Sequence, residues 1–174
     1  MNLLFVILWS WKIMIIGDSL SLFPGGYQTQ LSNSVTNISK VGRPTSEMLN
    51  ILDKNKSKIR KHDLVIIYGG INDIYGGANE SVVVNNIQKM VNIVNENGGH
   101  PVLILGYNPL KVQHNKDKAM KYYNLQTSLK TKIHGVRRIV PIFDDINNSH
   151  MSKDGIHLNV KGNRAFTEHL LNHI

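Results

Sequence analysis

The chain has 174 residues, which suits one domain with a full hydrophobic core. It contains no cysteine, which excludes disulfides, thiolate metal ligands and cysteine nucleophiles. The net charge of +8 would suit a nucleic acid, an anionic lipid or an acidic polysaccharide. However, the basic residues are scattered along the sequence and the aromatic stacking motifs of RNA-binding proteins are absent, which disfavours nucleic acid as a partner.

Residues 1–11 are strongly apolar. They lack the basic start and the small-residue cleavage site of a signal peptide. Even when extended through residue 16, the run is shorter than the roughly 20 residues that span a bilayer. Two interpretations stay open, an N-terminal extension of the fold and a short segment that contacts a membrane. The absence of a convincing export signal or transmembrane helix favours an intracellular protein.

The first predicted strand covers residues 13–16, an unbroken apolar run typical of a strand buried on both faces. Residues 17–19, Gly-Asp-Ser, then allow a sharp turn and favour the start of a helix. A short helical segment is expected over residues 28–31 and a short strand over residues 35–39. Cap residues and an acid in the first turn open a helix that should run from residue 45 to about residue 60.

A second unbroken apolar run predicts a strand over residues 64–68. The clearest helix begins at Asn79, repeats apolar residues at steps of three and four, and ends at Gly98. The remaining predicted elements are a strand over residues 102–105, an amphipathic helix through residues 122–133, a strand over residues 139–143 and a final helix from about residue 159. Because proline cannot donate to a strand ladder, Pro141 predicts an edge position for the last strand. Alternating strands and helices predict a single α/β domain over residues 1–174, a three-layer α/β/α sandwich with a central parallel sheet.

Three polar segments follow predicted strands: Gly17-Asp18-Ser19-Leu20, Gly70-Ile71-Asn72-Asp73 and Asp154-Gly155-Ile156-His157. In open α/β sheets, ligands bind at the carboxyl ends of the strands, so these segments should converge in one cleft. A serine hydroxyl is a weak nucleophile until an imidazole takes its proton, and the imidazole needs a carboxylate on its other nitrogen. Asp154 and His157 are three residues apart, so one turn of chain can join their side chains.

A negatively charged reaction intermediate needs fixed hydrogen-bond donors, which the Gly42 N–H and the Asn72 amide can supply. Each of these polar residues also has a structural alternative: Ser19 can cap a helix, Asn72 can hold a turn, and Asp154 can accept from backbone amides. Asp18 and Asp73 are expected to hold turns. His150 lies near several carboxylates, but the spacing matches no compact zinc motif.

A resemblance to a known family lies in four blocks of the sequence: Gly17-Asp18-Ser19-Leu20, Gly42, Gly70-Ile71-Asn72-Asp73 and Asp154-Gly155-Ile156-His157. These blocks occur in the order found in the SGNH hydrolase superfamily, also called GDSL esterases and lipases. The chain resembles this superfamily along essentially its whole length. The resemblance implies a flavodoxin-like α/β/α fold without a metal or organic cofactor. It implies Ser19 as nucleophile, His157 as general base and Asp154 as its orienting acid. The oxyanion hole would consist of the Ser19 and Gly42 backbone amides and the Asn72 side chain.

The short chain leaves little room for a lid, which indicates a shallow site for a small acyl group. Residues expected to line its mouth are Leu20, Phe23, Tyr75, Tyr107, Leu110 and Ile156. The favoured reaction is hydrolysis of a small acyl ester, such as an acetyl group on a carbohydrate, ahead of lysophospholipid or thioester substrates. A non-catalytic carbohydrate-binding module on the same fold is the alternative outside the enzymes.

Overall fold

The computed structural model describes residues 12–22, 26–31, 34–62 and 64–174. Its strands are β1 (Lys12–Gly17), β2 (Ser34–Asn37), β3 (Leu64–Tyr68), β4 (Pro101–Ile104) and β5 (Arg138–Val140). Its α-helices are α2 (Thr45–Lys54), α3 (Ile71–Tyr75), α4 (Glu80–Glu96), α5 (Lys116–Lys132) and α6 (Val160–Leu171). Short 3-10 helices are η1 (Ser19–Ser21), η2 (Tyr27–Thr29), η3 (Lys56–Lys61), η4 (Pro109–Lys111) and η5 (Asn148–His150).

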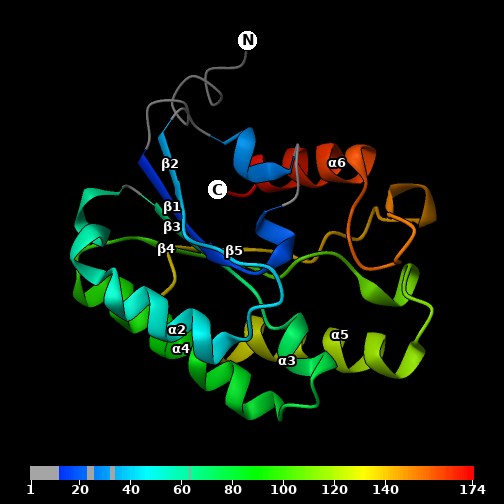
Figure 1. The fold of residues 1–174 in the computed structure, drawn as a ribbon, viewed down its shortest axis with the longest axis horizontal. Helices are drawn as coiled ribbons and strands as arrows, with labels where there is room; N and C mark the ends of the chain where they lie inside the picture. Colours follow the sequence, from blue (N-terminus) through cyan, green and yellow to red (C-terminus); the bar gives the residue numbers. More distant parts are fainter. Residues whose placement is uncertain (1–11, 23–25, 32–33, 63) are drawn as a thin grey trace.

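The strands form one parallel sheet in the order β2-β1-β3-β4-β5. The central strand β3 is buried along its whole length, as its unbroken apolar sequence requires. Helices α2 to α5 lie on one side of the sheet, and α6 lies on the other with η2 (Figure 1). The predicted α/β/α fold with a parallel sheet is therefore confirmed.

Strand β5 is an edge strand, as Pro141 predicted, but it ends at Val140. The ladder stops there because proline has no N–H to donate. It resumes as a single bridge between Tyr107 and Phe143, where the Phe143 N–H donates to the Gly106 carbonyl at 2.8 Å. The strand predicted over residues 139–143 is thus interrupted by its own proline.

The prediction of a helix from residue 45 to about residue 60 is wrong about where the helix ends and about which residue caps it. Helix α2 stops at Lys54, and η3 follows as a separate 3-10 helix. The N-cap position is Pro44, which has no side-chain cap, and the Thr45 N–H donates instead to Asp73 Oδ2 at 2.9 Å. A carboxylate from α3 therefore caps α2, a contact that local sequence does not encode.

Helices α4 and α6 begin where the sequence indicates, because asparagine caps both of them. Asn79 accepts a hydrogen bond from the Ser81 N–H, and Asn159 accepts one from the Gly162 N–H. Within the residues described, no helix is both long enough and apolar enough to cross a membrane. The apolar segment over residues 1–11 lies outside the described residues.

Candidate active site

Ser19 begins η1, immediately beyond the carboxyl end of β1. Asp18 caps this short helix, since its Oδ1 accepts from the Leu20 N–H at 2.9 Å. The turn requires glycine at position 17, because a Cβ there would come within 2.7 Å of the Tyr68 carbonyl oxygen of the neighbouring strand. Close packing of β1 against β3 thus fixes where the Ser19 hydroxyl emerges.

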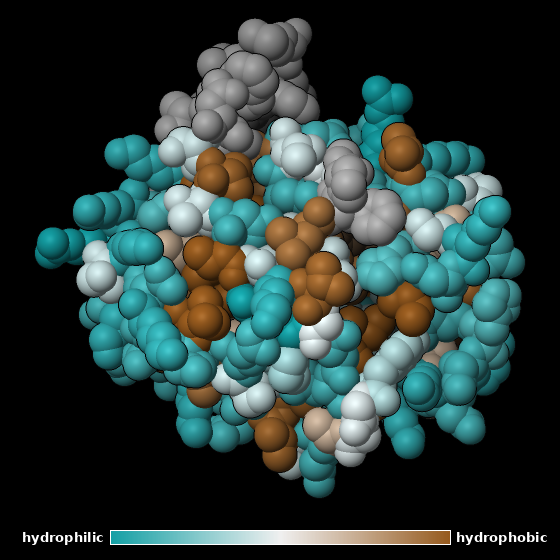
Figure 2. Space-filling model, in the orientation of Figure 1, coloured by the Kyte–Doolittle hydropathy of each residue, from teal (hydrophilic) through white to brown (hydrophobic). Residues whose placement is uncertain are grey.

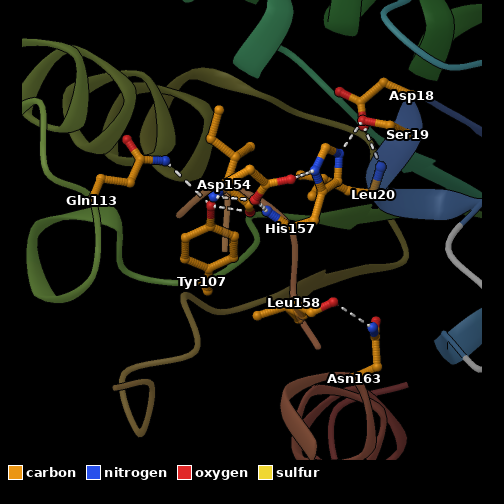
Figure 3. A network of polar contacts seen from close by, with 10 residues as sticks. Asp18, Ser19, Leu20, Tyr107, Gln113, Asp154, His157, Leu158 and Asn163 are labelled. Carbon is orange, nitrogen blue, oxygen red and sulfur yellow. Dashed lines mark hydrogen bonds and ion pairs between the residues drawn. The ribbon is translucent and has the colours of Figure 1, made fainter. Parts of the chain in front are cut away.

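The predicted serine, histidine and aspartate meet in one series of hydrogen bonds (Figure 3). Ser19 Oγ lies 2.9 Å from His157 Nε2, although 138 positions separate the two residues. His157 Nδ1 lies 2.7 Å from Asp154 Oδ2. The other carboxylate oxygen, Oδ1, accepts from the backbone N–H groups of Ile156 and His157, both at 2.9 Å. Both oxygens of Asp154 are therefore held, and the imidazole bridges the hydroxyl and the carboxylate.

Two carboxyl groups of the site have pKa values shifted in opposite directions. Burial acts to raise the pKa of Asp154, but hydrogen bonds from the His157 backbone, the His157 ring and the Ile156 N–H outweigh it and lower the pKa. Asp18 is fully buried, and burial raises its pKa to about 7 against the opposing effects of the Leu20 N–H, the His157 charge and the Asn72 amide. Asp154 is therefore held as a carboxylate, whereas Asp18 titrates near neutral pH.

Asn72 lies in the first turn of α3, between the Ser19 turn and the loop that contains Gly42. Its Nδ2 donates to Asp18 Oδ2 at 3.1 Å and, at 3.4 Å, to the Arg43 carbonyl. Gly42 is exposed and has a φ of +71°, a left-handed conformation that other residues adopt only with strain. The structure therefore places the Asn72 amide next to the segment that contains Gly42.

Asp73 ties this loop to α3. Its Oδ1 accepts from Thr45 Oγ1 at 2.7 Å and its Oδ2 from the Thr45 N–H at 2.9 Å. Asn86 of α4 also donates to Thr45 Oγ1, at 3.1 Å. The start of α2, three residues after Gly42, is thereby bonded to the helix that carries Asn72.

The residues expected at the mouth of the site do not all lie there. Tyr107 is 0% exposed and belongs to the core, whereas Leu20, at 7% exposed, is buried but lines a small cavity beside His157. Tyr75, Leu110 and Ile156 are partly exposed. The remaining predicted residue, Phe23, lies outside the described residues.

Tyr107 instead belongs to a buried polar network that the sequence analysis missed. Its hydroxyl donates to the Ile156 carbonyl at 2.6 Å and accepts from Gln113 Nε2 at 3.2 Å (Figure 3). The Tyr75 hydroxyl donates to Gln113 Oε1. The network links α3 to the loop of Asp154 and His157. The position of Tyr107, an aromatic residue just after β4, was a sequence signal that could have indicated this network. Nothing in the local sequence indicates that Gln113 belongs to it.

His150 is used structurally. It is buried in η5, and its Nδ1 accepts from the Asn147 N–H at 3.2 Å as part of a capping box. In the described part of the chain, no group of three or more histidine or acidic side chains is arranged to hold a metal ion. A small cavity of about 10 Å³ borders His157 and is otherwise lined by Leu20, Tyr68, Leu158, Asn163 and Phe166.

A parallel α/β/α sandwich with bonded serine, histidine and aspartate side chains at the carboxyl edge of its sheet is typical of serine hydrolases. A family comparison makes the assignment specific. The chain belongs to the GDSL-like lipase/acylhydrolase family, whose model matches residues 16–165. It is therefore a hydrolase of the GDSL type.

Solved structures share this fold at low sequence identity. A G-D-S-L lipolytic protein from Veillonella parvula is 16% identical, with a TM-score of 0.76 over 92% of this chain and 96% of that one. The psychrotrophic esterase EstA from Pseudoalteromonas sp. is 20% identical, with a TM-score of 0.71 over 92% of this chain and 94% of that one. The acetyl xylan esterase AlAXEase is 15% identical, with a TM-score of 0.71 over 92% of this chain and 98% of that one. No curated protein matches the sequence.

Proposed function

We propose that the chain is a serine esterase that hydrolyses a small acyl ester, with an acetyl group on a carbohydrate as the favoured substrate. One observation carries the proposal: the hydrogen-bonded series from Ser19 Oγ to His157 at 2.9 Å and from His157 to Asp154 at 2.7 Å. A hydroxyl bonded to an imidazole, which is bonded in turn to a fixed carboxylate, is the arrangement that makes serine nucleophilic.

In the first half of the reaction, Ser19 Oγ bonds to the ester carbonyl carbon while His157 Nε2 takes the hydroxyl proton. Asp154 accepts from Nδ1–H and stabilises the imidazolium that forms. The tetrahedral intermediate then collapses, the bond to the alcohol oxygen breaks, and Nε2–H protonates the departing alcohol. In the second half, His157 takes a proton from water, which attacks the acyl-enzyme, releases the acid and regenerates the Ser19 hydroxyl.

The negative charge that develops on the carbonyl oxygen would be met by the Ser19 and Gly42 N–H groups and by the Asn72 amide. Asn72 already donates to the Arg43 carbonyl, but at 3.4 Å this bond is long. An oxyanion is a stronger acceptor and would displace it. The shorter bond to Asp18, at 3.1 Å, would keep the amide oriented during the exchange.

Two features of the surface support a small acyl group. The cavity beside His157, at about 10 Å³, has room for about one water molecule or methyl group. On the face shown in Figure 2, hydrophobic residues form separate small groups within a hydrophilic surface. A long acyl chain would need a continuous apolar groove instead. An acetyl xylan esterase among the similar structures gives the carbohydrate ester further support.

The test compares the wild-type chain with Ser19→Ala on a panel of acetylated sugars, lysophospholipids, acyl thioesters and a short aryl ester. We expect the acetylated sugars to give the highest kcat/KM, and Ser19→Ala to lower kcat by about 10⁴-fold or more. Ser46→Ala, an exposed serine on α2, is the matched control and should retain full activity.

Equal rates for the wild-type chain and Ser19→Ala would refute the esterase mechanism. Faster turnover of lysophospholipids or thioesters would refute the acetyl ester while leaving the mechanism intact. Binding of an acetylated glycan without turnover of any ester would favour the carbohydrate-binding alternative.

A further inference from the structure

We propose that Arg43 is a positioning residue, whose guanidinium holds the Gly42 N–H in the place that the oxyanion hole requires. The proposal rests on the esterase function proposed above. Arg43 follows Gly42 directly, in the turn between β2 and α2. Its side chain is only 7% exposed, and arginine is seldom buried to this extent unless its charge is paired. The contacts of this buried guanidinium indicate what it does.

The tip of this turn has little support of its own. Val41 is 69% exposed, and no atom lies within 4 Å of a Cβ placed on Gly42. Among the residues that the structure describes, no hydrogen bond between two backbone groups involves Val41 or Gly42. Packing and backbone bonding therefore do not fix the direction of the Gly42 N–H, and a side chain has to do so.

Both ends of the turn are held firmly. At its start, the Ile38 N–H donates to the Ile15 carbonyl at 2.9 Å, and the Lys40 N–H donates to the Gly17 carbonyl at 3.2 Å. These two bonds attach the turn to β1, the strand that leads to the nucleophile. At its end, Thr45 is bonded to a carboxylate of α3. The turn therefore offers fixed points to which its tip can be tied.

The Arg43 side chain ties the tip of the turn to these fixed points. Its Nη1 donates to the Ile38 carbonyl at 2.5 Å, and its Nε lies 3.4 Å from Glu47 Oε1 in the first turn of α2. Hydrogen bonds from a guanidinium are stronger than neutral ones, and its planar fork sets their direction.

This tie matters most during the reaction. Asn72 donates to the Arg43 carbonyl at 3.4 Å, and in the proposed mechanism this amide turns to the oxyanion. The backbone beside Gly42 then loses that donor at the moment when the Gly42 N–H must stay aimed at the developing charge. The guanidinium bond to Ile38 does not involve the reacting atoms, so it can hold the turn throughout the exchange.

The experiment measures hydrolysis of a short aryl ester by Arg43→Met, which replaces the guanidinium with a neutral side chain. We expect kcat to fall by about 10- to 100-fold while KM changes less than about threefold, because a displaced oxyanion donor weakens binding of the transition state alone. Glu47→Gln removes the partly exposed ion pair but leaves the bond to Ile38, so its kcat should stay within about threefold of wild type. Arg60→Met, which removes an exposed arginine from η3, is the matched control and should retain full activity.

Two further variants separate positioning from a general effect on the fold. Arg43→Lys can still donate to the Ile38 carbonyl, but from a shorter side chain, so its kcat should lie between those of Arg43→Met and wild type. In Gly42→Ala the N–H is already displaced, so adding Arg43→Met should lower kcat by less than about threefold more. A purely structural role would instead give the full loss again in the double variant.

A second readout needs no turnover, so the esterase proposal can fail without affecting it. The heteronuclear NOE of the Gly42 amide, measured by NMR, should fall in Arg43→Met and stay at the wild-type value in Glu47→Gln. Circular dichroism and urea unfolding establish that each variant is folded. The proposal is overturned by a wild-type kcat or NOE in Arg43→Met, by a raised KM in place of a lowered kcat, or by additive losses with Gly42→Ala. If Arg43→Met does not fold, Arg43→Lys decides by the same two readouts, and wild-type values of both overturn the proposal.

Discussion

Replacing Asp18 with asparagine should change how the stability of the fold depends on pH. The Asp18 side chain is 0% exposed and accepts from the Leu20 N–H at 2.9 Å and from Asn72 Nδ2 at 3.1 Å. Burial raises its pKa from the ordinary 3.8 to about 7, because the charged form is removed from water. These two hydrogen bonds and the His157 charge oppose the rise without cancelling it.

The sign of the effect follows from proton binding. In the unfolded chain Asp18 loses its proton near pH 4, whereas in the folded protein it keeps the proton up to about pH 7. Between these values the folded state binds more protons, so the free energy of unfolding falls as the pH rises. Each unit of pKa difference is worth about 1.4 kcal/mol, so the full loss above neutral pH is on the order of 4 kcal/mol.

Asparagine carries no charge at any pH, so Asp18→Asn removes the part of the free energy of unfolding that depends on the Asp18 proton. Its amide can accept from only one of the two present donors, and we expect a loss of about 1–3 kcal/mol at acidic pH. The assay is urea unfolding of both proteins from mildly acidic to mildly basic pH. The stability of Asp18→Asn relative to wild type should rise with pH between about pH 4 and pH 7 and should level off above neutrality. Asp145→Asn, which removes a carboxylate at an exposed position, is the control. If the free energy of unfolding has the same pH dependence in Asp18→Asn as in the wild type, the reasoning is refuted.

Three further substitutions test the parts of the site. Asn72→Ala should lower kcat by about 10²–10³-fold with little change in KM, and an unchanged kcat would remove Asn72 from the oxyanion hole. Tyr107→Phe leaves the Ile156 carbonyl without its donor, so kcat should fall and urea unfolding should show a loss of about 1–3 kcal/mol; wild-type kcat would show that this anchor does not position the His157 loop. Gly42→Ala should cost about 1–2 kcal/mol of backbone strain without a clash, because no atom lies within 4 Å of the added Cβ, and should lower kcat. Gly77→Ala, equally open and left-handed, is its control; equal kcat values for the two would contradict a special role for Gly42.

The elements that the sequence predicts well are those with signals in their own residues. β3 spans residues 64–68 as predicted because an unbroken apolar run has no solvent-facing side. α4 begins after Asn79 as predicted because the capping residue and the first turn are adjacent in sequence. The predicted end of α2 was wrong because Ile59 does not continue the apolar face of that helix. It packs instead against Gly99 of a distant turn.

The same distinction separates the predicted part of the site from the part that was missed. Ser19 and His157 could be placed at one edge because each follows a strand whose direction the topology determines. The sequence gives no measure of how completely the fold surrounds Asp18. A Cβ on Gly69 would meet Met48 Sδ at 2.6 Å and lie 3.8 Å from Asp18 Oδ2, so the backbone and a core methionine close over the carboxyl. A residue expected only to hold a turn thereby becomes a buried acid that titrates near neutral pH, and this property depends on tertiary packing rather than on the Gly-Asp-Ser-Leu segment itself.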